Sequence, residues 1–258
     1  MENRNRTVWE FDKIWTKYFS KDRAILVENG RSAIQQSLIA LKSEKVALPT
    51  YTCHRVLQAC FMAHTTPFIV DCGTDLQIDV EKIPTNVDTV VVPHMFGIQA
   101  DVAGIRKKFP KIKIIEDCSQ CIGLSDLGKH ADVVIASTGP TKWLNAGESK
   151  EFGGSILAYN FSYSALKPYE DFKIMSKLNE MFVTIPTMLA SRQAKANELI
   201  NAGIDLIGAD RPNAYLRAMY FGKQKRIPYI ALHDIHQHWN CPVVDGYKNK
   251  LEWISIFP

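Results

Sequence analysis

The chain lacks blocks of like charge and hydrophobic runs of membrane-spanning length. Its 31 basic and 27 acidic residues are scattered over 258 positions, so charge indicates neither a nucleic-acid nor a membrane partner. No segment reaches the roughly 20 apolar residues that span a bilayer, and the first residues, MENRNR, lack the apolar core of a signal peptide. We therefore expect a cytoplasmic protein that binds no nucleic acid and no membrane.

Cysteines are too few and too dispersed for the disulfide framework of a small secreted protein. The six lie at positions 53, 60, 72, 118, 121 and 241, mostly within or beside apolar stretches, and we expect them to be reduced. Cys118 and Cys121 form a C-x-x-C pair without a second pair or a histidine cluster nearby in the sequence. This pattern favours a structural role for the two cysteines. Redox or zinc chemistry is the alternative.

Apolar runs alternate with helical patterns up to about residue 160. The runs at 67–70, 89–92, 112–115 and 133–136 are continuous and are each followed by polar residues or by proline and histidine, which is typical of parallel strands buried on both faces. With 46% hydrophobic residues the chain can bury a large core. The pattern predicts an α/β fold, a three-layer sandwich with a mainly parallel central sheet over residues 1–160, and a smaller, partly helical region over 161–258.

The most informative residues follow the last two of these runs. Run 112–115 leads into Glu116 and Asp117, and run 133–136 leads into STGPTK at 137–142, which ends in Lys142. Ligands of open α/β sheets bind outside the carboxyl ends of the strands, so an acid and an amine can meet there. A partly desolvated lysine can form a Schiff base, and we predict Lys142 and Asp117 as the catalytic pair.

Six ordered segments resemble the DegT/DnrJ/StrS family of pyridoxal-phosphate-dependent sugar aminotransferases, members of the fold type I aspartate aminotransferase superfamily. They are NGRSA at 29–33, LPTYTC at 48–53, PFIVD at 67–71, HMFG at 94–97, IEDCSQ at 115–120 and STGPTK at 137–142. Their joint order carries the resemblance, which covers roughly residues 20–160. It implies pyridoxal 5'-phosphate as the cofactor.

The resemblance gives catalytic roles to Lys142 and Asp117 and a cofactor-binding role to Gln120. Lys142 would bind the cofactor covalently and shuttle the proton, and Asp117 would face the ring nitrogen, which must stay protonated if the ring is to act as an electron sink. Gln120 matches the position that holds the phenolic oxygen of the cofactor.

Further positions match the family's cofactor-binding residues. The phosphate would lie against Gly30, Arg31 and Ser32 at a strand-to-helix turn, with the hydroxyl of Ser137 beside them. Cys53 stands where the family usually has an aromatic ring stacked on the cofactor, so the stacking group is unassigned.

The implied reaction transfers an amino group from glutamate or glutamine to a keto sugar, expected to be nucleotide-linked, and the implied assembly is a homodimer. Two alternatives stay open. The same cofactor supports dehydration or elimination, and a catalytically degenerate regulatory protein would bind pyridoxal phosphate or another ligand without turnover. Cys53, four extra residues within 147–154 and a region after residue 160 that is shorter than in the family motivate the second alternative.

Histidines and arginines of the C-terminal half give weaker signals. His233, Asp234 and His236 could converge on a metal, but no further ligand stands at a supporting spacing, and we predict no metal site. Four arginines also occur there: Arg192, Arg211, Arg217 and Arg226. They could bind substrate phosphates, although a solvated basic face is the commoner explanation, and none is assigned.

Overall fold

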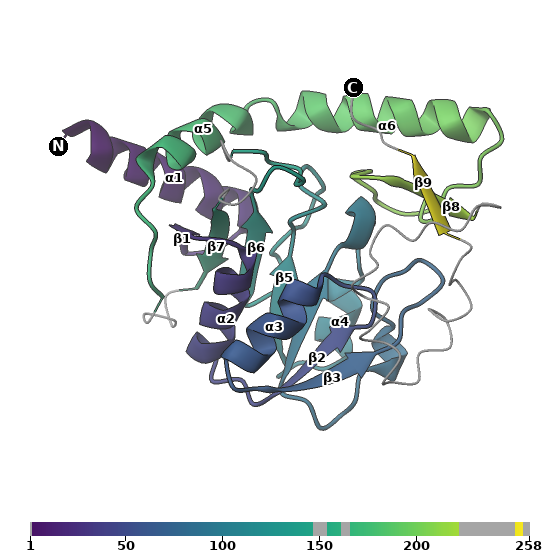
Figure 1. Cartoon of the computed structure of the whole chain (residues 1–258), viewed down its shortest axis with the longest axis horizontal. Coiled ribbons are helices and arrows are strands. Elements are labelled where there is room, and N and C mark those ends of the chain that lie inside the picture. The colour runs from purple at the N-terminus through teal and green to yellow at the C-terminus, as the bar shows by residue number, and fades with distance from the viewer. Residues whose placement is uncertain (1, 147–153, 161–165, 222–250, 255–258) are drawn as a thin grey trace.

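The computed structural model describes residues 2–146, 154–160, 166–221 and 251–254, which contain a seven-stranded sheet with helices on both faces (Figure 1). The strands are β1 (Arg23–Val27), β2 (Lys45–Pro49), β3 (Thr66–Val70), β4 (Thr89–Pro93), β5 (Lys113–Asp117), β6 (Val133–Ser137) and β7 (Ser155–Tyr159). Their order is β1-β7-β6-β5-β4-β2-β3, and within this sheet only β7 runs antiparallel to its neighbours. The carboxyl ends of the other six strands therefore share one edge.

Helices follow most of the strands. They are α1 (Glu2–Phe19), α2 (Gly30–Ala40), α3 (His54–Met62), α4 (Val102–Lys108), α5 (Phe172–Phe182) and α6 (Ile185–Asn201), with two 3₁₀ turns, η1 (Val80–Lys82) and η2 (Met95–Gly97). The side chain of Asn29 caps α2 by accepting the backbone N–H of Ser32. Because α2 and α3 begin just after β1 and β2, both helices start at the shared carboxyl edge.

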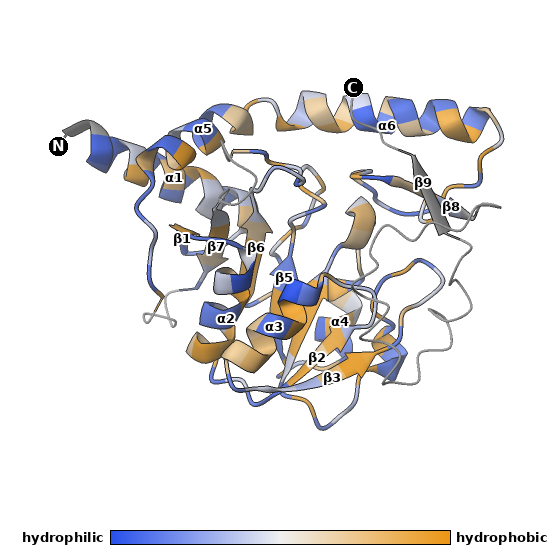
Figure 2. Ribbon diagram, in the orientation of Figure 1, coloured by the Kyte–Doolittle hydropathy of each residue, from blue (hydrophilic) through white to orange (hydrophobic). Residues whose placement is uncertain are grey.

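The core is divided by the sheet into two parts. On one face Val91, Ile115 and Ile135 belong to a cluster with α2 and α3. On the other face Ile114 and Val134 belong to a cluster with α1, α4 and α5, and Figure 2 shows the central strands coloured as mainly hydrophobic between helices of mixed character. Successive residues of a strand point to opposite faces, so Asp117 continues the face of Ile115 toward α2 and α3, whereas Glu116 continues the face of Ile114.

The predicted three-layer α/β sandwich with a mainly parallel sheet is confirmed. Two features were not predicted: β7 inserts antiparallel between β1 and β6, and β8 (Ala218–Phe221) pairs with β9 (Leu251–Ile254) in a small second sheet. The helical pattern after residue 162 corresponds to α5 and α6. Within the described ranges, no helix has both the length and the apolar character required to cross a bilayer.

Candidate active site

A cavity of about 310 Å³ lies at the carboxyl edge of the sheet, next to the starts of α2 and α3. Its lining residues are Asn29, Gly30, Arg31, Ile34, Cys53, Arg55, Val56, Asp117, Ser119, Ser137 and Lys142. Six of the eight predicted site residues are in this set, namely Gly30, Arg31, Cys53, Asp117, Ser137 and Lys142. The structure thus brings the predicted amine, acid and phosphate-binding turn into one space.

Asp117 is the half-buried last residue of β5, and its carboxylate is oriented by the following turn. Its Oδ1 accepts the backbone N–H of Ser119 at 3.0 Å, and Oγ of Ser119 accepts the N–H of Ser137 at 2.8 Å. Ser119 therefore ties the ends of β5 and β6 together. The second oxygen of Asp117 has no protein partner in the described part of the chain, so it can accept a proton or hydrogen bond from a ligand.

Lys142 is half-buried in the loop after β6. Its backbone N–H donates to the carbonyl of Gly139 at 2.9 Å, and the next residue, Trp143, is buried and anchors the loop. The guanidinium of Arg192 in α6 lies over the Trp143 ring, 4.6 Å from its centroid, and donates to the carbonyl of Tyr215 at 3.3 Å. No ion pair among the described residues involves the amine of Lys142, which leaves it available for covalent chemistry.

The start of α2 forms a cradle suited to an anion. A Cβ at Gly30 would lie 3.3 Å from the Cβ of Ser137, so the backbone of α2 approaches β6 closely. The first N–H groups of a helix lack intrahelical partners and favour negative charge. The N–H of Ser32 donates to Asn29, whereas those of Gly30 and Arg31 are open among the described residues. Ser32 is not in the cavity lining, and its place in the phosphate site stays a prediction.

Gln120 is not among the residues that line the cavity, and its contact with the phenolic oxygen of the cofactor stays a prediction. It is buried, its Oε1 accepts the N–H of Phe96 at 2.8 Å, and its Nε2 contacts the sulfur of Met95 at 3.5 Å. Phe96 has a left-handed φ of 63° within η2. The Gln120 side chain therefore stabilises a turn that contains a residue in the left-handed region.

On the opposite face of the sheet, a buried pair was not recognised in the sequence. His94 Nε2 lies 2.8 Å from Oε1 of Glu116, and its Nδ1 accepts the N–H of Ala100 at 2.9 Å. The proton consequently sits on Nε2. The other carboxylate oxygen accepts the N–H of Gly128 at 2.9 Å.

Cys118 and Cys121 adjoin this pair, and their sulfur atoms and a ring nitrogen of His94 all lie within 4.8 Å of one another. This grouping has the composition of a metal site. However, the proton of His94 is on Nε2 and faces Glu116. A metal at Nε2 would displace this proton and leave an imidazolate, because Nδ1 accepts the N–H of Ala100 and carries no proton. In the usual arrangement the second ring nitrogen of a metal-bound histidine donates a hydrogen bond. Burial also raises the pKa of the Cys118 and Cys121 thiols, which favours the structural role expected for this C-x-x-C pair.

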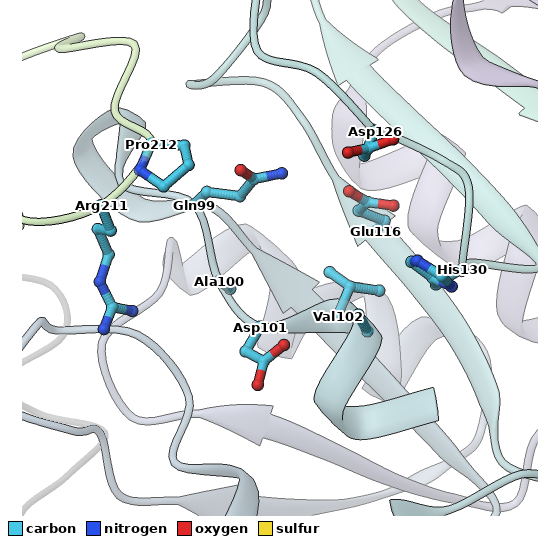
Figure 3. Close-up of a pocket in the computed structure, with 10 residues that line it drawn as sticks. Gln99, Ala100, Asp101, Val102, Glu116, Asp126, His130, Arg211 and Pro212 are labelled. Carbon is cyan, nitrogen blue, oxygen red and sulfur yellow. The ribbon is translucent and has the colours of Figure 1, made fainter. Parts of the chain in front are cut away.

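A second cavity, of about 400 Å³, lies near Glu116 and is lined by loops and the start of α4 (Figure 3). Arg211 lies at one end and is paired with Asp75, while Asp101 accepts the N–H of Gly104 at the start of α4. These charged groups already have partners. None of its lining residues is a lysine, so the amine chemistry belongs to the first cavity.

The C-terminal arginines do not form a single solvated face. Arg192 is only 5% exposed, so a solvated face does not describe this residue. Its side chain extends from α6 over the ring of Trp143. Arg226, the histidine group at 233–238 and the insertion at 149–152 lie outside the described residues.

A mostly parallel α/β sheet with a lysine, a carboxylate and an anion-binding helix start at its carboxyl edge defines a fold type I cofactor-binding protein. The sequence pattern of the DegT/DnrJ/EryC1/StrS aminotransferase family matches residues 2–158, and the chain belongs to this family. The resemblance seen in the sequence is confirmed, and with it pyridoxal phosphate as the family's cofactor.

Individual relatives illustrate this membership. A 3-oxo-glucose-6-phosphate:glutamate aminotransferase of Bacillus subtilis (strain 168) is 32% identical over 143 residues, which are 52% of this chain and 32% of that protein. The match thus covers about a third of the length of this curated relative.

Solved structures share the fold at low identity. NtdA of Bacillus subtilis with bound cofactor PMP superposes with a TM-score of 0.67 at 22% identity, covering 83% of this chain and 58% of that chain. A GDP-4-keto-6-deoxymannose-3-dehydratase (ColD) variant with bound GDP-perosamine superposes with a TM-score of 0.80 at 12% identity, covering 97% and 88%. At these identities the likeness establishes the fold alone.

The donor set of the first cavity fits pyridoxal phosphate. Lys142 supplies an amine for the aldehyde, and Asp117 supplies an acceptor for a protonated ring nitrogen. The N–H groups of Gly30 and Arg31 and the hydroxyl of Ser137 suit a phosphate.

Proposed function

We propose that this chain is a pyridoxal-phosphate-dependent aminotransferase that transfers an amino group from glutamate or glutamine to a keto sugar. The observation that carries the proposal is the placement of Lys142 and Asp117 in one cavity with the start of α2, in a member of this family. The fold alone would not support it, because one fold hosts many reactions.

The residues have distinct proposed roles. When bound, the cofactor supplies an electron sink that acidifies the carbon bearing the amino group. Lys142 removes the proton from that carbon and returns it at the acceptor side. Asp117, oriented by Ser119, accepts a hydrogen bond from the ring nitrogen, and Gly30, Arg31 and Ser137 hold the phosphate.

The proposal also concerns the acceptor sugar and the reactions that compete with amino transfer. The Bacillus subtilis relative is named for a hexose phosphate, so we propose an acceptor that carries phosphate, either a free sugar phosphate or a nucleotide-linked sugar. Dehydration is the second candidate, because a sugar dehydratase shares this fold. Binding without turnover is the remaining alternative, and it stays open because Cys53 replaces the usual aromatic ring.

We also propose a homodimer in the cytoplasm, without a nucleic-acid or membrane partner. Phe61 and Met62 at the end of α3 are 56% and 44% exposed, which gives an apolar patch that a second copy would cover. The five described cysteines are free, as in a reducing compartment. We divide the chain into a cofactor domain, 1–160, and a small C-terminal region, 161–258.

Absorption spectroscopy of the purified protein tests the function. We expect added pyridoxal phosphate to produce the band of the lysine-bound cofactor, Lys142→Ala to abolish it, and glutamate to convert it to that of the amine form. Lys129→Ala, at a largely exposed lysine, is the matched control and should keep the band. Protein that takes up no cofactor rejects the proposal, and a band that no amino donor changes supports binding without turnover.

A further inference from the structure

We propose that Arg55 binds the phosphate group of the acceptor sugar, at a second anion subsite of the cavity that holds Lys142 and Asp117. The inference rests on the proposed function and deepens it, because it assigns substrate recognition to a particular residue. No motif of the sequence pointed to Arg55.

The charges of the cavity provide the first argument. Among its described lining residues, Arg31, Arg55 and Lys142 are cationic and Asp117 is anionic. The cofactor accounts for three of these groups, since Lys142 binds it covalently, Asp117 faces the ring nitrogen, and Arg31 lies in the turn that would hold its phosphate. Arg55 is then a cation of the cavity without a counter-charge.

The immediate contacts of Arg55 agree with this account. Its Nη1 donates to the neutral side chain of Gln58 at 3.3 Å, and within the described ranges it forms no ion pair with a carboxylate. Burial and, as a smaller cause, the Arg55 charge lower the pKa of the neighbouring His54. Arg55 is exposed as well as lining the cavity, which places it where a substrate can reach it.

Arg55 enters the cavity from a different side than the cofactor's phosphate cradle. The cradle joins α2 to Ser137 of β6, whereas Arg55 is the second residue of α3, which follows β2. In the sheet, β5 and β4 lie between β6 and β2. With strands about 4.8 Å apart, the ends of β6 and β2 are separated by roughly 14 Å, so Ser137 and Arg55 reach the cavity from different strand ends.

The chemistry at the start of α3 favours phosphate. Arginine offers a planar fork of donors that matches phosphate oxygens. The N-cap residue Cys53 makes no side-chain hydrogen bond to the helix, and its carbonyl accepts the N–H of Val56 at 2.8 Å. Among the first-turn groups of α3, the N–H groups of His54 and Arg55 are therefore open to the same anion.

A pair of amino sugars that differ only in the phosphate tests the assignment. 3-Amino-3-deoxyglucose, with and without a 6-phosphate, is offered as amino donor to the cofactor-loaded protein, and conversion of the absorption band is followed. In Arg55→Gln we expect the half-saturating concentration of the phosphorylated sugar to rise about tenfold or more. The unphosphorylated sugar, glutamate and the affinity for pyridoxal phosphate should be unchanged.

Control variants separate this effect from a general change of charge. Arg55→Lys should retain part of the affinity for the phosphorylated sugar, because it keeps the charge and loses the planar fork. Arg6→Gln removes an exposed arginine of α1 and should behave as the unmodified protein. A nucleotide-linked amino sugar, tested in parallel, shows whether the phosphate comes from a monophosphate or from a diphosphate linkage.

Three results overturn the assignment. If Arg55→Gln weakens pyridoxal phosphate binding, the arginine holds the cofactor's phosphate. If it weakens the glutamate reaction to the same extent, the anion is the donor's carboxylate. If no phosphorylated sugar responds, Arg55 has no role in acceptor binding.

Calorimetry keeps this assignment separate from the proposed function. Binding of glucose 6-phosphate and of glucose to the cofactor-loaded protein requires no turnover. If glucose 6-phosphate binds through Arg55 but no amino group is transferred, the proposed function fails and the subsite stands. If amino transfer proceeds and Arg55→Gln binds glucose 6-phosphate normally, only the subsite fails.

Discussion

Gly30 and Ser137 face each other across the carboxyl edge of the sheet, so that a Cβ at position 30 would lie 3.3 Å from the Cβ of Ser137. Gly30 begins α2 and Ser137 ends β6, so this pair sets the width of the proposed phosphate cradle. A glycine here lets the backbone N–H groups approach an anion closely. The cradle is therefore a packing relationship between two elements that are distant in the sequence.

Gly30→Ala should narrow the cradle and lower the affinity for pyridoxal phosphate several-fold. Ser137 would have to shift by a few tenths of an ångström, because 3.3 Å is a tight contact for a Cβ. The free energy of unfolding should not fall, since alanine is favoured over glycine in a helix by about 1 kcal/mol. Gly139→Ala is the control, because its Cβ would meet nothing within 4 Å. Fluorescence titration with the cofactor measures both variants, and equal affinities would refute the cradle.

The fold was predictable where burial dictates the residue pattern. The continuous apolar runs of β4 to β6 identify strands covered on both faces, and Asn29 marks the start of α2. A continuous apolar run gives no direction, however. For that reason the segment SILAY at 155–159 does not show that β7 runs antiparallel between β1 and β6.

The site was predictable where function depends on strand ends. Lys142, Asp117 and Ser137 follow adjacent parallel strands, so the sequence alone brings them to one edge. For Gln120 and Ser32 the strand pattern is not enough, because Gln120 also bonds Phe96 and the Ser32 N–H bonds Asn29, and their contacts with the cofactor stay predictions. The His94–Glu116 pair was not predicted either. Glu116 points to the opposite face of the sheet from Asp117, and its contact with His94 joins two strand ends that the sequence does not show to be paired.

Asp117→Asn should reduce turnover by about a hundredfold, in line with the loss of one preorganised electrostatic group in an active site. Asparagine keeps the acceptor for the Ser119 N–H but removes the charge that faces the ring nitrogen, so the fold should be retained and cofactor affinity should fall. Asp126→Asn, at a largely exposed aspartate with a left-handed φ of 62° that asparagine tolerates, is the control. Unchanged steady-state activity of Asp117→Asn would overturn the role of Asp117.

Replacing Glu116 by glutamine should lower the free energy of unfolding by about 1–3 kcal/mol. Its two carboxylate oxygens accept the Nε2–H of His94 and the N–H of Gly128, and an amide can accept only one of these bonds. His94→Ala should cost more, about 3–5 kcal/mol, because it leaves a buried carboxylate without its ring partner. Urea unfolding measures both, with the half-buried His130→Ala as the control; equal stability of all three variants would contradict the pairing.

Cys53 should be the described cysteine that reacts fastest with iodoacetamide. It is half-buried and lines the cavity, whereas burial raises the pKa of Cys60 to about 11 and also raises those of Cys118 and Cys121. Thiolates are the reactive form, so the buried thiols should stay unmodified at neutral pH. Peptide mapping by mass spectrometry in a Cys241→Ser background measures the order. Pyridoxal phosphate should protect Cys53, and labelling that the cofactor does not slow would place Cys53 away from the bound ring.

Arg192→Met should loosen the loop that carries Lys142 although it changes no residue of the cavity. The buried guanidinium lies over Trp143, the residue after Lys142, and donates to the carbonyl of Tyr215. Methionine fills much of the volume but removes both interactions, which are together worth about 1–3 kcal/mol.

A looser loop exposes the lysine-bound cofactor to solvent, so hydroxylamine should remove the cofactor several-fold faster from Arg192→Met. Lys195→Met, also on α6 but half-exposed and paired with exposed Glu198, is the matched control. If both variants lose cofactor at the rate of the unmodified protein, α6 does not support the Lys142 loop. If only Arg192→Met is faster, the helical region after residue 160 contributes to cofactor retention through Trp143.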